Sequence, residues 1–124
     1  MDIDIHKEIK RVDVFSSCDD GFIALVAKNL RIKELPSDSE IIRFGEETTD
    51  VYINFDGILD VSYLLKEGKK VTFTLLTPYS IFGEISSIDG KIRSANIRTL
   101  SKSKLGIIRH EFFTKYMLTE MSFL

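Results

Sequence analysis

The sequence predicts a mainly β domain with flanking helices, folded as an antiparallel β-roll of the double-stranded jelly-roll type. Short runs of β-branched and aromatic residues recur along residues 31–108, and turn residues separate them at frequent intervals. No segment between these runs is long enough for a helical crossover, so neighbouring strands should pair antiparallel. The 124 residues, of which 44% are hydrophobic, suit one globular domain over residues 1–124.

We expect helices at both ends of the roll. Residues 1–30 form a helical lead-in, in which N-cap residue types precede apolar residues spaced three and four apart, and this spacing predicts a helix over 20–30. Residues 109–124 return to a helical pattern and should form a closing helix, with Phe112 and Tyr116 facing inward and Phe113 and Met117 as further candidates for the inner face. Its apolar end, 121–124, is expected to continue into a longer helix or to meet another subunit.

Roughly eight short strands are expected between the helices. Residues 66–69 resemble a hairpin tip, and in the strand that follows Val71, Phe73 and Leu75 should share one face. The clearest strand runs are residues 31–35, 40–44, 51–55, 58–64, 71–76, 95–99 and 105–108.

Bulk composition excludes several classes of function. A formal net charge of −2 gives no general attraction to nucleic acid or to an anionic membrane. The single cysteine, Cys18, excludes an internal disulfide and a multi-cysteine metal site. The N-terminus is charged where a signal peptide needs an apolar run, and no segment reaches membrane-spanning length. We therefore expect a cytoplasmic protein without a membrane partner.

One stretch, residues 81–95, has the residue types of an anion-binding site, and we call it the cradle. Gly83 and Glu84 open a short helical segment, whose free N–H groups attract an anion. Arg93 follows nine residues after Glu84 and can grip a phosphate bidentately. The glutamate would repel a phosphate, so it should accept hydrogen bonds from sugar hydroxyls. From these residues alone, an ordinary surface turn is an equally good interpretation.

The order of helix, eight-stranded roll, Gly-Glu cradle and closing helix resembles the cyclic-nucleotide-binding domain. This is the sensor domain of the catabolite activator protein, of protein kinase A regulatory subunits and of cyclic-nucleotide-gated channels. The resemblance covers residues 12–118 and is most specific at 82–86 together with 93–95. Supporting matches are Ile42, Gly45, Glu46, Asp50, Tyr52, Ile53, Gly57 and Val61.

The resemblance implies a role for each matching position. Glu84 would accept the ribose 2′-hydroxyl, and Arg93 would pair with the cyclic phosphate. Main-chain N–H groups of three residues and one hydroxyl would add donors, and three side chains would contact the purine. The donors are Gly83, Ile85, Ser86 and Ser94, and the purine contacts are Val61, Phe73 and Thr74.

Two positions depart from the family pattern. Ile92 stands where the family often has proline before the arginine, which is a mild change because proline mainly stiffens the approach. Tyr79, preceded by Pro78, stands where a glycine usually precedes the Gly-Glu pair. This second change predicts a remodelled turn with Tyr79 near the pocket.

The resemblance implies the sensor domain of a bacterial transcription regulator of the catabolite-activator type. It would bind cAMP in preference to cGMP, need no cofactor, and form a homodimer in the full-length protein. DNA would be contacted only through a segment absent from this chain. The alternative is a degenerate roll that serves as a dimerisation or interaction module, or that senses a different small effector.

A metal enzyme of the cupin type shares the roll architecture. Its chemistry needs clustered histidine and carboxylate ligands on facing strands, and the chain has only His6 and His110, which flank the roll. No catalytic constellation is recognisable in the sequence, so we predict a binding module and not an enzyme.

Overall fold

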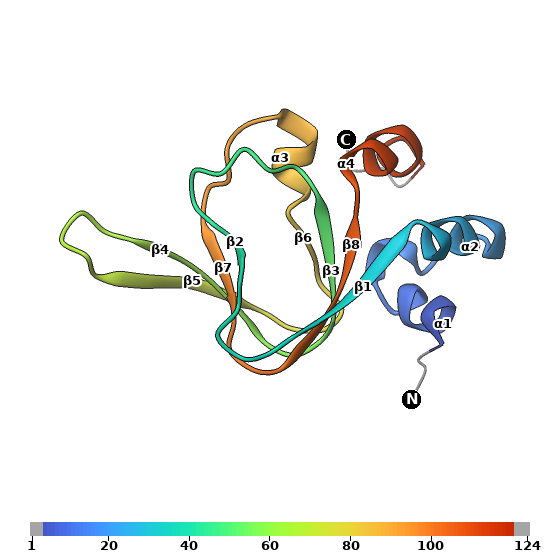
Figure 1. Ribbon diagram of the computed structural model, residues 1–124. Coiled ribbons are helices and arrows are strands. Elements are labelled where there is room, and N and C mark those ends of the chain that lie inside the picture. The colour runs from blue at the N-terminus through green and yellow to red at the C-terminus, as the bar shows by residue number, and fades with distance from the viewer. Residues whose placement is uncertain (1–3, 121–124) are drawn as a thin grey trace.

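The computed structural model describes residues 4–120 as two four-stranded antiparallel sheets that face each other, with helices at one side (Figure 1). This confirms the predicted roll. One sheet has the order β1-β8-β3-β6 and the other β2-β7-β4-β5. The strands are β1 (Leu30–Leu35), β2 (Glu40–Ile42), β3 (Val51–Asp56), β4 (Leu59–Leu64), β5 (Lys70–Leu76), β6 (Ile81–Phe82), β7 (Asn96–Thr99) and β8 (Ser103–Ile108).

Three short helical segments precede the roll: α1 (Ile5–Lys10), a 3₁₀ turn (Asp13–Phe15) and α2 (Asp20–Lys28). The Asp19 carboxylate accepts the Phe22 N–H at 2.8 Å and so caps α2, as N-cap residues do. The predicted helix over 20–30 is therefore confirmed, but it ends two residues early because Leu30 already pairs with Ile108 in β8.

The core has two parts. The first joins the N-terminal helices to β3, β8 and the closing helix, and the second lies between the two sheets. Removing these apolar side chains from water is the main source of the fold's stability. The first part includes Ile9, Phe15, Ile23, Val51, Ile108, Phe113 and Met117, and the second consists of Ile42, Leu59, Phe82, Ile97 and Leu105.

The β4–β5 hairpin projects from the roll on the side opposite to α1 and α2 (Figure 1). Its register contains a bulge, because Val61 pairs with Thr74 while Ser62 pairs with Thr72. Phe73 is the extra residue on the bulged strand, and its side chain is 71% exposed. The expected alternation of Val71, Phe73 and Leu75 on one face is therefore interrupted, since a bulge shifts the phase of the strand.

The closing helix begins with α4 (His110–Phe112) and continues as a π-helical turn (Phe113–Met117). Phe112, Phe113 and Met117 are buried as predicted, but Tyr116 is 41% exposed. The prediction for Tyr116 was wrong because it assumed 3.6 residues per turn, and the wider π turn changes which residues face the core. The end of the predicted helix, 121–124, lies outside the described residues.

Tyr79 also differs from its predicted place. Its hydroxyl hydrogen-bonds to the Glu8 carboxylate at 3.3 Å, and the Arg11 guanidinium lies 4.4 Å from the centre of its ring. The tyrosine thus packs on the N-terminal helices, a contact that a glycine at this position could not make. Within residues 4–120, no helix is both long and apolar enough to cross a membrane.

Candidate functional site

The cradle starts where β6 gives way to the helix α3 (Glu84–Asp89). Gly83 makes this change of direction with φ of +82°, in the left-handed region that favours glycine. A Cβ atom at this position would lie 3.1 Å from Nη1 of Arg93 and 3.1 Å from the Asp50 carbonyl oxygen. Glycine is therefore required both by the backbone turn and by the close approach of the arginine.

Arg93 is held by three hydrogen bonds to uncharged oxygen atoms. Its Nη1 donates to the Gly83 carbonyl at 2.8 Å and its Nη2 to the Asp50 carbonyl at 2.8 Å. Its Nε donates to the Thr48 hydroxyl at 3.0 Å. A guanidinium has five N–H donors, so two remain for a ligand.

The loop between β2 and β3 holds the main chain of Arg93. The Gly45 N–H donates to the Arg93 carbonyl at 2.9 Å, and the Arg93 N–H donates to the Glu46 carbonyl at 2.8 Å. Together with the bonds from Thr48 and Asp50, this loop fixes both the backbone and the guanidinium. The group is thus preorganised for binding, which lowers the ordering cost when a ligand arrives.

No carboxylate within the described residues pairs directly with the charge of Arg93. The residue is only 2% exposed. Burial lowers the pKa of its guanidinium, and nearby acidic groups only partly oppose this. A buried cation without an ion-pair partner is costly, so an anion placed here would gain a strong charge-assisted interaction.

Glu84 carries the second unusual charge of the cradle. Burial raises the pKa of its carboxyl group, while the positive charge of Arg93 acts in the opposite direction. Its Oε2 atom is buried and has no hydrogen-bond partner within the described part of the chain. An acceptor of this kind fits a ligand hydroxyl group, which would supply the missing donor.

We expect the stability effect of Glu84 to depend on pH. Its raised pKa means that the folded state disfavours the ionised form, so a penalty develops as pH rises above the ordinary value of about 4.5. Glu84→Gln removes this penalty. Without ligand, the free energy of unfolding of the variant minus that of the unaltered chain should therefore be larger at about pH 7 than at about pH 4. Urea unfolding at both pH values measures this.

Glu67→Gln, at the exposed tip of the β4–β5 hairpin, is the control and should show no such rise. A difference between Glu84→Gln and the unaltered chain that stays constant with pH would contradict the account of Glu84.

A small cavity of about 120 Å³ lies against the cradle. Six of the predicted site residues line it, and three do not. Phe73 and Thr74 lie exposed on β5. Glu84 is not among the lining residues, but Gly83 and Ile85 on either side of it are. The lining residues are the predicted Val61, Gly83, Ile85, Ser86, Arg93 and Ser94, together with Ile42, Ala95 and Ile97.

A second hollow of about 530 Å³ shares Ser94 with this cavity. Its other lining residues, Phe44, Tyr63, Leu64 and Asn96, are mostly apolar. A pocket that encloses a whole drug-sized ligand usually measures about 300–1,000 Å³. The small cavity therefore has room for the phosphate end of a nucleotide, while its base would extend beyond it.

Sequence reasoning missed Thr48 as a contact of Arg93 and did not predict a role for the Asp50 carbonyl. Both residues lie more than forty positions before Arg93 in the sequence. A threonine hydroxyl and a main-chain oxygen have no distinctive pattern, so only the fold reveals these contacts. No group of three or more histidine, cysteine or acidic side chains that could hold a metal occurs among residues 4–120.

Residues 32–120 match the protein family described as "Cyclic nucleotide-binding domain". The match includes the whole cradle and more than half of the chain. The chain belongs to the cyclic nucleotide-binding domain family. The cyclic nucleotide-gated cation channel of Ictalurus punctatus is 31% identical to this cyclic nucleotide-binding domain over 110 residues. The aligned region is 83% of this chain but only 16% of the channel.

Solved structures of cyclic nucleotide-binding domains share the fold. The regulatory domain of Toxoplasma gondii PKA with cAMP matches with a TM-score of 0.85 and 20% identity, over 95% of this chain and 45% of that one. The catabolite activator protein of Thermus thermophilus matches with a TM-score of 0.77 and 20% identity, over 88% of this chain and 51% of that one. At this level of identity, the likeness shows the fold alone.

Proposed function

We propose that this chain binds a cyclic nucleotide with its phosphate against Arg93 and its ribose 2′-hydroxyl on Glu84. The observation that carries this proposal is a fixed, buried arginine without an ion-pair partner among the described residues. A cyclic phosphate supplies one negative charge and oxygen acceptors for its two remaining donors. The N–H groups of Gly83, Ile85 and Ser86, at the start of α3, and the Ser94 hydroxyl add further donors.

The base would extend out of the small cavity. Val61 lines the small cavity, and Ser94 lines both this cavity and the larger hollow. Phe73 and Thr74 on the hairpin would meet the base only beyond the cavity, as an apolar wall with one hydroxyl group. A large exposed aromatic ring such as Phe73 has area to bury when it meets a purine.

cAMP is our preferred ligand over cGMP. The preference rests on Ser94, because a serine after the arginine suits cAMP in the bacterial family members that this chain resembles. The T. gondii regulatory domain, which has the same fold, is also a complex with cAMP.

The wider role that we propose is a cytoplasmic sensor in a bacterial transcription regulator, acting as a binding module and not as an enzyme. The fold shared with the T. thermophilus catabolite activator protein supports this role, as does the order of elements from the lead-in to the closing helix. The full-length protein would form a homodimer and contact DNA through another segment. Bound nucleotide would favour one packing of the closing helix and so change the position of a segment attached to it.

Thermal melting tests nucleotide binding directly. A ligand at a hundred times its dissociation constant adds about 2.7 kcal/mol to the stability of the state that binds it. For a domain of about 100 residues, this corresponds to a rise of more than about 10 °C in Tm. We expect such a rise with cAMP, a smaller one with cGMP at the same concentration, and none with 5′-AMP at concentrations where cAMP saturates.

No shift with either cyclic nucleotide would favour the second candidate, a degenerate roll or a sensor of another effector. Retention of both Glu84 and Arg93 favours the first candidate, because loss of binding should appear first as loss of these two residues.

A further inference from the structure

The closing helix begins at His110, and this residue makes two hydrogen bonds to the framework of the cradle. Its ring atom Nδ1 lies 2.7 Å from the Ser87 hydroxyl oxygen. Its main-chain N–H donates to the Asp50 carboxylate at 3.2 Å. A hydroxyl group both donates and accepts, so the Ser87 contact is possible with either tautomer of the ring.

Each of these contacts leads directly to a group that would hold the nucleotide. Ser87 is 2% exposed and lies in α3, three residues after Glu84 and next to Ser86. Asp50 accepts the His110 N–H with its side chain and holds the Arg93 guanidinium with its carbonyl, at 2.8 Å. One residue of the closing helix therefore touches both the helix of the cradle and the residue that fixes its arginine.

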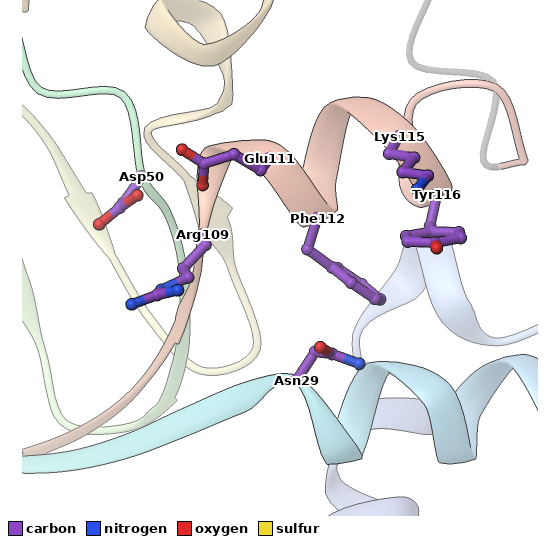
Figure 2. A pocket seen from close by; sticks show the side chains of 7 residues that line it. All are labelled: Asn29, Asp50, Arg109, Glu111, Phe112, Lys115 and Tyr116. Carbon is purple, nitrogen blue, oxygen red and sulfur yellow. The ribbon is translucent and has the colours of Figure 1, made fainter.

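The start of the closing helix has space beside it. Asp50, Arg109 and Phe112 line a hollow of about 590 Å³ between α2 and the closing helix. Figure 2 shows Asp50 and Arg109 at one end of this hollow, Lys115 and Tyr116 at the other, and Phe112 and Asn29 between them. Phe112, Phe113 and Met117 pack the helix on the core, and the two hydrogen bonds of His110 tie its first residue to the cradle.

We infer that His110 is a positioning residue for the nucleotide site, which couples the cradle to the closing helix through Ser87 and Asp50. This inference rests on the proposed function. His110 holds α3 and Asp50 in place, so it keeps the donors of α3 and of Arg93 aimed into the cavity. The coupling is reciprocal. If the His110 contacts strengthen nucleotide binding, bound nucleotide must stabilise these contacts by the same free energy.

Side-chain variants test the role of the ring contact. His110→Ala and Ser87→Ala should each weaken cAMP binding about five- to twentyfold, because each removes one partner of a buried hydrogen bond. The double variant should be little worse than either single variant, since both break the same contact. His110→Asn places an amide near the position of Nδ1 and should restore most of the affinity, whereas His110→Gln places it near Nε2 and should not.

Histidine-ring NMR gives a readout that a purely structural role would not move. The chain has two histidines, and His6 lies exposed in α1, away from the cradle. On titration with cAMP, the ring signals of His110 should shift to saturation while those of His6 stay in place. His6→Ala, the matched control variant, should bind cAMP like the unaltered chain.

The outcomes separate this inference from the proposed function. Binding of cAMP with unmoved His110 signals, or with unchanged affinity in both His110→Ala and Ser87→Ala, overturns the inference alone. An unaltered chain that binds neither cAMP nor cGMP overturns the proposed function and the inference with it.

Discussion

Arg93→Ala is expected to weaken cyclic nucleotide binding by about 2–5 kcal/mol, a loss of roughly 30- to 5,000-fold. The guanidinium is already fixed by Gly83, Thr48 and Asp50, so its position depends little on the ligand. Without it, the phosphate would be desolvated in the cavity and would lack its counter-charge. Calorimetric titration with cAMP measures the loss, and a circular dichroism spectrum shows whether the variant is folded.

Arg98→Ala is the matched control for this prediction. Arg98 lies in β7, five residues after Arg93, and forms ion pairs with Asp38 and Glu40. Because the side chain of this arginine is 39% exposed and lines no part of the cradle cavity, its loss should change cAMP affinity by less than about 0.5 kcal/mol. Equal affinities of the Arg93→Ala and Arg98→Ala variants would show that the buried cation is not the phosphate ligand.

Gly83→Ala should lower both stability and nucleotide affinity. The left-handed backbone at φ of +82° costs a non-glycine residue about 1–2 kcal/mol. The added Cβ atom would also press on Nη1 of Arg93 and on the Asp50 carbonyl, so we expect a total loss of about 2–4 kcal/mol in the free energy of unfolding. Displacement of the guanidinium should in addition weaken cAMP binding about tenfold or more.

Gly68→Ala separates the two causes. Gly68 lies at the hairpin tip with a φ of +85°, but a Cβ atom there would meet nothing within 4 Å. Its variant should show the backbone cost alone, with unchanged affinity for cAMP. If urea unfolding gives equal losses for the two variants, and both bind cAMP normally, the close packing of Gly83 on Arg93 has no functional role.

Local sequence signals predicted most of the roll and the cradle. Strands alternate with turn residues over short distances, and the cap at Asp19 and the Gly-Glu pair at 83–84 are each readable within a few positions. These features depend on neighbours in the chain, so the fold class, the second N-terminal helix apart from its last two predicted residues, and the position of the cradle could all be obtained from the sequence.

Features that depend on the phase of an element could not be obtained in this way. Phe73 is the extra residue of a bulge, and a bulge interrupts the alternation of side chains along its strand. Tyr116 lies in a π turn, which is rare and has no clear sequence pattern. In both cases the prediction assumed a regular period where the structure has an irregular one.

Contacts between distant segments form the second group of features that the sequence does not reveal. The bonds from Arg93 to Thr48 and to the Asp50 carbonyl join two loops, and the contact of Ser87 with His110 joins two helices. Tyr79 contacts Glu8, seventy-one residues earlier in the sequence. Such partners are uncommitted polar residues until the fold brings them together.

A crystal structure of the chain grown with cAMP tests the central claim most directly. We predict density for the nucleotide in the cavity lined by Val61, Ser86 and Arg93, with a phosphate oxygen within hydrogen-bond distance of the Arg93 guanidinium. The ribose hydroxyl should lie against the Glu84 carboxylate. Nucleotide bound elsewhere, for example in the hollow between α2 and the closing helix, with Arg93 still bonded only to Thr48, Asp50 and Gly83, would contradict the account.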